Sequence, residues 1–67
     1  MRRFPAPWTV EPIEAGFKVN DANGQGIAYV YGYADKRDAE TAKGLTLDEA
    51  RRIAANIAKL PKLLARQ

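Results

Sequence analysis

The strongest constraint on the fold is the stretch from Phe17 to Tyr33, where two alternating segments flank the turn sequence Asp21-Ala22-Asn23-Gly24. Apolar and polar residues that alternate on both sides of such a turn predict an antiparallel β-hairpin. Two registers fit this stretch. Either Asn23 and Gly24 form a two-residue turn, or a three-residue loop begins with a type I turn at Asp21 and places Gly24 in a left-handed conformation.

The side-chain pattern favours the three-residue loop, because a slip of one residue moves every side chain to the other face and this register separates the two faces more cleanly. It pairs Asp21 with Gln25, Val19 with Ile27, and Phe17 with Tyr29. One face then carries the large apolar side chains of Phe17, Val19, Ile27, Tyr29, Tyr31 and Tyr33. The opposite face carries Lys18, Asn20, Gly26, Ala28, Val30 and Gly32.

A helix is predicted over residues 46–60. Thr46 and Glu49 form a capping box, in which the threonine hydroxyl accepts the Glu49 N–H and the glutamate carboxylate accepts the Thr46 N–H. At 100° per residue the apolar side chains share one stripe, made of Leu47, Ala50, Ile53, Ala54, Ile57, Ala58 and Leu60. Pro61 predicts an end or kink near Leu60, and residues 61–67 are expected to form a turn and tail, with Leu63 and Leu64 folded back onto the core.

The remaining segments complete a single small domain over residues 1–67. Residues 1–7 are expected to be loose, and 8–11 to form a short edge strand that stops at Pro12. Residues 8–34 therefore make the sheet, and the polar stretch 35–45 is expected to be a loop. The predicted fold class is α+β: a two- to three-stranded antiparallel sheet around the hairpin, packed on one C-terminal amphipathic helix, ββ(β)α.

The amino-acid composition argues against an enzyme. The chain has no cysteine, histidine or serine, so the common nucleophile–base pairs cannot form. No cofactor and no metal are expected, since the sequence offers neither a phosphate-binding loop nor cysteine and histidine ligands. A non-enzymatic module is therefore predicted.

The second strand of the hairpin carries three tyrosines, Tyr29, Tyr31 and Tyr33. They can be interpreted either as a stacking surface or as the buried side of the strand. The helix needs an apolar sheet face to cover its stripe, so Tyr29 and Tyr31 are predicted to lie in the core, with Tyr33 half exposed. The other face would then be small, flat and poor in charge. It gives the candidate interface, formed by Lys18, Asn20, Ala28, Val30 and Gly32.

Self-association is the expected use of that interface. Twelve apolar residues are alanines, which leaves a thin core, and a chain of 67 residues without disulfides commonly gains stability from a partner. The main functional prediction is thus a small interaction module that forms a homodimer or binds a protein partner. Within one chain, the N-terminal segment with Phe4 and Trp8 could instead cover the same face.

Nucleic-acid binding is the alternative function. The net charge of +3 is mild, and the basic residues are dispersed along the chain. Candidate contacts with DNA or RNA are Arg2, Arg3, Lys18, Lys36, Arg37, Arg51 and Arg52. Arg51 and Arg52 are more simply explained by pairing with Asp48 and Glu49 one helical turn away.

The segments PWTVE, FKVNDANGQ, AYVY and LTLDEARRIAANIAKLPKLL together resemble a family of short uncharacterised proteins of soil bacteria. The resemblance covers residues 5–64 and implies a bacterial protein, without an activity or site residues to carry over. A looser architectural likeness links the hairpin and LDEARRIAANI to the three-stranded-sheet-plus-helix domains of AP2-type factors and integrases. Those domains read DNA with arginines and an aromatic residue on the sheet face, where this sequence offers Lys18 and Asn20.

The cytoplasm is the default location. Arg2 and Arg3 are not followed by the apolar run of a signal peptide, and no stretch approaches the roughly 20 apolar residues of a membrane span. No membrane partner is therefore expected.

Overall fold

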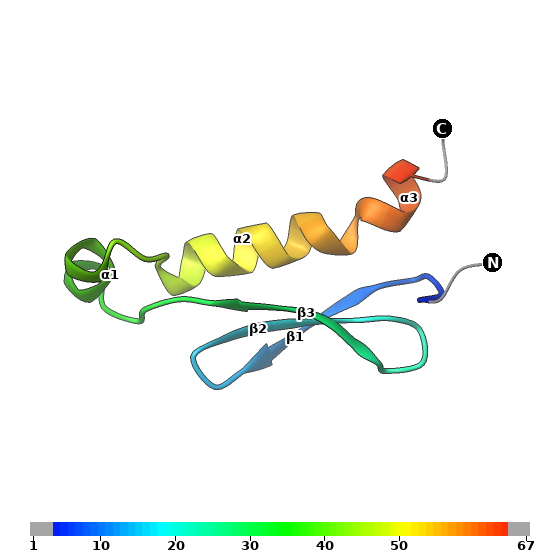
Figure 1. The fold of residues 1–67 in the computed structure, drawn as a ribbon, viewed down its shortest axis with the longest axis horizontal. Coiled ribbons are helices and arrows are strands. Elements are labelled where there is room, and N and C mark those ends of the chain that lie inside the picture. The colour runs from blue at the N-terminus through cyan, green and yellow to red at the C-terminus, as the bar shows by residue number, and fades with distance from the viewer. Residues whose placement is uncertain (1–3, 65–67) are drawn as a thin grey trace.

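The computed structural model describes residues 4–64, which form one three-stranded antiparallel sheet and three helices. The strands are β1 (Thr9–Ile13), β2 (Gly16–Asn20) and β3 (Gly26–Tyr31), in the spatial order β1-β2-β3. The longest helix, α2 (Leu47–Ala58), lies along one face of the sheet (Figure 1). The predicted α+β class, with a sheet on a C-terminal helix, is confirmed.

The edge strand β1 runs farther than predicted. It continues through Pro12, which is opposite Phe17, and ends at Ile13. A proline is tolerated here because one side of an edge strand has no neighbouring strand, so no hydrogen bond of the ladder is lost when the N–H is missing. A tight turn at Glu14 and Ala15 then leads into β2, with Ala15 in a left-handed conformation at φ 65°.

The hairpin loop has the predicted three residues. The Asp21 N–H donates to the Gln25 carbonyl at 3.0 Å, and the Asp21 carboxylate accepts the N–H groups of Asn23 and Gln25 at 2.9 and 2.8 Å. Gly24 takes the left-handed position at φ 84°.

The register beyond this loop differs from the prediction. A β-bulge shifts the pairing, so that Asn20 is opposite Gly26 but Val19 is opposite Ala28. Ile27 is the extra residue, and every later side chain of β3 is turned to the other face. The predicted face assignment of β3 is therefore wrong for Ala28, Tyr29, Val30 and Tyr31.

The core lies between α2 and the sheet face that carries Val19. Val19, Ala50 and Ala54 are completely buried, and α2 packs chiefly on β2 and β3. Two members of the predicted apolar stripe are less covered than expected, because Ile53 is 41% exposed and Leu60 is 38% exposed. Among the described residues, Val19 is the only side chain larger than alanine that is fully buried.

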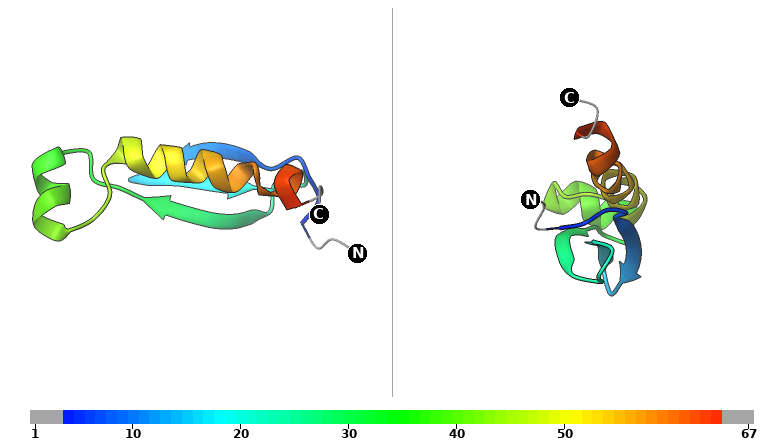
Figure 2. Two further views of the ribbon diagram at one scale, coloured as in Figure 1. Left: turned by 90° about the horizontal axis from the view of Figure 1, so that it is seen from above. Right: turned by 90° about the vertical axis from the view of Figure 1, so that its right-hand side faces the viewer.

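A short helix replaces part of the loop predicted for residues 35–45. This helix, α1 (Lys36–Ala42), begins where the Asp35 carboxylate accepts the Arg37 N–H at 2.8 Å, and it ends at Lys43 in a left-handed conformation. It buries Ala39 and lies at the far end of the molecule, beyond the sheet (Figure 2).

The capping box of α2 is present as predicted: the Thr46 N–H donates to the Glu49 carboxylate at 2.9 Å, and the Glu49 N–H donates to the Thr46 hydroxyl at 3.1 Å. The helix stops at Ala58, and a further short helix, α3 (Leu60–Leu64), follows after Lys59. Pro61 is buried in the first turn of α3, where it needs no N–H partner. Leu63 and Leu64 do not fold back, since they are 55% and 57% exposed.

The N-terminal residues that the structure describes are held against the hairpin. The Ala22 N–H donates to the Pro5 carbonyl at 2.9 Å, and the Trp8 indole N–H donates to the Phe4 carbonyl at 3.1 Å. Phe4 and Trp8 are half-buried. The expectation of a loose segment is therefore wrong for residues 4–7, whereas residues 1–3 lie outside the described range.

Candidate interaction surface

The sheet face turned away from α2 is the candidate interaction surface. The register places Glu11, Lys18 and Tyr29 in one row across the three strands, and Ile13, Gly16 and Tyr31 in the next. No helix of the described chain lies over this face (Figure 2). We call it the tyrosine face, formed by Glu11, Ile13, Lys18, Tyr29 and Tyr31.

The two tyrosines are the exposed large apolar side chains of the tyrosine face. Tyr29 is 53% exposed and Tyr31 is 59% exposed, so the prediction that both lie in the core is wrong. The cause is the bulge at Ile27, which exchanges them with Ala28 and Val30. Tyr33, at 43%, is half exposed as predicted.

The tyrosine rings lie close to the sheet because glycines beneath them leave room. A Cβ at Gly26 would come within 2.7 Å of the Tyr29 hydroxyl and 2.8 Å of the Lys18 Cε. A Cβ at Gly16 would come within 3.1 Å of the Tyr31 Cδ1. Rings that lie along the backbone present a flat, broad surface rather than two projecting side chains.

The charged groups of the tyrosine face are few and of both signs. The Lys18 Nζ is 5.9 Å from the centroid of the Tyr29 ring, within the range of a cation–π contact. Glu11 is directly opposite Lys18 in the β1–β2 pairing, and its carboxylate accepts the Asn20 side-chain N–H at 2.9 Å. The Asn20 Oδ1 is buried and has no hydrogen-bond partner within residues 4–64.

The structure divides the predicted interface between two faces. Lys18 lies on the tyrosine face and Asn20 bonds to Glu11 there, whereas Ala28 and Val30 share the register of the buried face. Gly32 lies against the start of α2, where a Cβ would be 2.5 Å from the Thr46 carbonyl oxygen. The small, smooth face that was expected does not exist as one surface.

The predicted nucleic-acid contacts are not brought together either. Lys18 is on the sheet, whereas Lys36 and Arg37 begin α1 at the far end of the molecule (Figure 1). Arg2 and Arg3 lie outside the described residues. Eight basic and eight acidic residues balance within residues 4–64, so Arg2, Arg3 and Arg66 account for the net charge.

Arg51 and Arg52 form the intrahelical pairs that the sequence favours. Both guanidinium groups bind the Asp48 carboxylate, at 2.8 and 2.9 Å, while Glu49 is engaged in the capping box. The hydrogen bond from Arg51, followed by the charge of Arg52, holds the pKa of Asp48 below its usual value. These arginines are thus partly neutralised on the helix surface.

Two signals for the tyrosine face were present in the sequence. Gly26, just before the extra residue Ile27, is typical of a bulge, and Glu11 alternates with apolar residues on the neighbouring strand. Neither signal fixes the position of a bulge by itself. Among residues 4–64 there is also no group of three or more carboxylates that could hold a metal ion.

Comparison of the chain with protein-family models, with curated proteins and with solved structures finds no match in any of the three, so the resemblance to short soil-bacterial proteins stays a prediction.

Proposed function

We propose that this protein is a non-enzymatic interaction module that forms a homodimer through its tyrosine face. The observation that carries the proposal is an imbalance in burial. Val19 is the one fully buried side chain larger than alanine in the described chain, while Tyr29 and Tyr31 leave more than half of their surface exposed. A second copy would bury these rings and add the apolar contact area that the core lacks.

The charges of the tyrosine face suit a second copy. Glu11 and Lys18 are neighbours of opposite sign, and a twofold axis that passes between them would place each against its opposite in the other copy. Such self-complementarity lets a flat face pair with itself without like charges meeting. Ile13 and the two tyrosines supply the apolar centre that isologous interfaces need.

The experiment is sedimentation velocity together with thermal unfolding over a hundredfold range of concentration. We expect a monomer–dimer equilibrium and a melting temperature that rises with concentration, since the stability of a dimer depends on protomer concentration. The double variant Tyr29→Ser/Tyr31→Ser should be monomeric. Tyr33→Ser should still dimerise, because Tyr33 follows β3 and its ring lies against Gly44 in the connection between α1 and α2. A monomer at every concentration, with a constant melting temperature, would refute the proposal.

Single-stranded nucleic acid is a second candidate, favoured by two exposed tyrosines with Lys18 beside one of them. The balanced charge of residues 4–64 and the presence of Glu11 weigh against it. The test is an NMR titration with a mixed-sequence oligonucleotide at low and at near-physiological salt. Shifts centred on Tyr29 and Tyr31 that weaken steeply with salt would favour this function over the first.

A further inference from the structure

The helix α3 places three leucines on the surface at one end of the molecule. Leu60 is 38% exposed, Leu63 is 55% exposed and Leu64 is 57% exposed. Three of the five residues of this helix are therefore exposed leucines. Its inward contact is made by the buried Pro61. We call Leu60, Leu63 and Leu64 the leucine tip.

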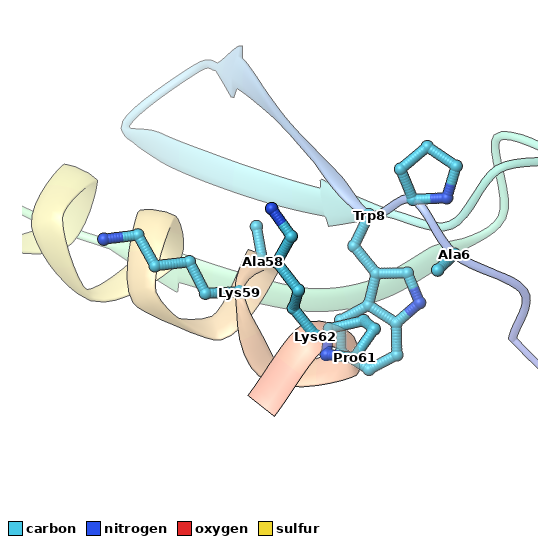
Figure 3. Close-up of a pocket in the computed structure, with 7 residues that line it drawn as sticks. Ala6, Trp8, Ala58, Lys59, Pro61 and Lys62 are labelled. Carbon is cyan, nitrogen blue, oxygen red and sulfur yellow. The ribbon is translucent and has the colours of Figure 1, made fainter. Parts of the chain in front are cut away.

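A groove lies beside the leucine tip, between the N-terminal segment and the junction of α2 with α3 (Figure 3). It has a volume of about 550 Å³. Pro7 and Trp8 form one wall and Ala58 and Pro61 the other, so both walls are apolar. Lys59 and Lys62 also line the groove, and the lining includes no acidic residue.

Acidic residues are concentrated toward the opposite end of the molecule. Asp35, Asp38 and Glu40 belong to α1 and its cap, at the end farthest from α3 (Figure 1). Asp48 and Glu49 occupy the first turn of α2. The hairpin near the N-terminal segment contains Asp21, but its carboxylate is engaged by two backbone N–H groups.

We infer that the end of the molecule formed by the leucine tip and this groove docks on an anionic lipid surface. Leucines beside lysines, with a tryptophan next to them, are the chemistry of interfacial membrane contact: the apolar side chains enter the acyl boundary while the ammonium groups reach the headgroups. The leucines project outward and do not line the groove, which suits a deformable bilayer better than a rigid peptide ligand.

This contact is peripheral. Within residues 4–64, the helices are too short or too polar to serve as a membrane span. The expectation of no membrane partner rested on the lack of a membrane-spanning segment. A contact with the lipid surface does not need such a segment. The docking end is separate from the tyrosine face, so the inference does not depend on the proposed dimer.

The experiment uses Trp8, the one tryptophan of the chain, as the reporter. The full-length protein is mixed with vesicles of phosphatidylcholine and phosphatidylglycerol in a three-to-one ratio, and with vesicles of phosphatidylcholine alone. We expect a blue shift of the Trp8 emission and co-sedimentation with the anionic vesicles, and much weaker binding to the neutral ones. Added salt should weaken the binding.

Matched variants assign the binding to this end. Leu63→Asp/Leu64→Asp should abolish it, and Lys59→Glu/Lys62→Glu should lower the partition coefficient at least about tenfold. Lys36→Glu/Lys43→Glu carries the same change of charge at the opposite end and should alter binding less than about twofold. Circular dichroism of each variant checks that the fold is retained.

Several results would overturn the inference. One is the absence of an emission shift with anionic vesicles, and another is equal weakening by the two lysine pairs, which would mean that net charge alone drives binding. A third is that the wild type does not bind vesicles while Leu63→Asp/Leu64→Asp disrupts the dimer, which would mean that a second copy, and not a lipid surface, covers the leucine tip. Loss of the dimer through Tyr29→Ser/Tyr31→Ser with lipid binding intact would instead support both the proposed dimer and the separate lipid-docking end.

Discussion

The ring of Tyr31 lies against the backbone of Gly16 on the neighbouring strand, so closely that a Cβ on Gly16 would come within 3.1 Å of the tyrosine Cδ1. The same Cβ would meet the carbonyl oxygen of Val30, which belongs to the sheet itself. A glycine at this position is thus required both by the backbone of β3 and by the ring that lies over it.

Gly16→Ala is expected to lower the free energy of unfolding by about 1–3 kcal/mol, since the new methyl group meets backbone that cannot move freely. Gly26→Ala is the matched control. There the methyl group meets the ends of the Tyr29 and Lys18 side chains, which can rotate away. Urea unfolding of both variants checks the difference. Equal losses would show that the ring contacts, rather than the Val30 carbonyl, dominate at Gly16.

Ala15→Gly should raise the free energy of unfolding by roughly 0.5–1 kcal/mol, because Ala15 occupies a left-handed conformation that glycine adopts without strain. The greater freedom of glycine in the unfolded chain offsets part of this gain. Ala55→Gly, within α2, should have the opposite sign and cost about 1 kcal/mol. Thermal unfolding of the two variants at one protein concentration gives both values, and destabilisation by Ala15→Gly would contradict the turn conformation.

Thr46→Ala should destabilise the protein by about 1 kcal/mol, because the Glu49 N–H loses the hydroxyl that caps it. Thr46→Ser keeps that oxygen and should cost much less. Chemical unfolding followed by the helical circular dichroism signal measures both. A Thr46→Ser variant as unstable as Thr46→Ala would mean that the threonine methyl group, and not the cap, contributes the stability.

Asp48 should make stability depend on acid pH. Its pKa is lower in the folded protein than in the unfolded chain, chiefly through the Arg51 hydrogen bond. The contribution is therefore present above the unfolded pKa, near 4, and is lost as the pH falls through the folded pKa. The carboxylate is exposed, so the effect is small.

The comparison for Asp48 is with Asp48→Asn, in urea unfolding at neutral pH and at about pH 2. The wild type should be the more stable of the two at neutral pH, and the difference should shrink in acid. A difference that persists at low pH would assign the effect of Asp48 to something other than its charge.

The elements that local chemistry specifies could be predicted from the sequence. The capping box at Thr46 needs two side chains three residues apart, and the loop after Asp21 needs a carboxylate and a glycine at fixed positions. Both are decided within a few residues of chain. The general architecture followed from them, because one amphipathic helix must cover one face of a small sheet.

The elements that depend on tertiary balance could not be predicted. The bulge at Ile27 changes the pairing without changing the hydrophobic pattern, and either register leaves an apolar set facing α2. The structure fills that face with Ala28 and Val30, which fit beneath a helix lined with Ala50 and Ala54. The helix α1 was missed because it buries one small residue, Ala39, and so lacks an apolar stripe.

The bulge at Ile27 also determines which changes would alter the exposed surface. Loss of Ile27 would close the bulge and leave Val19 opposite Ala28 and Lys18 opposite Tyr29, so the tyrosines would stay on the outer face. If Ile27 were instead kept and paired with Val19, every later side chain of β3 would turn over and the tyrosines would lie beneath α2. One composition is thus compatible with two molecular surfaces, and the pairing of a single residue decides which of them is available for binding.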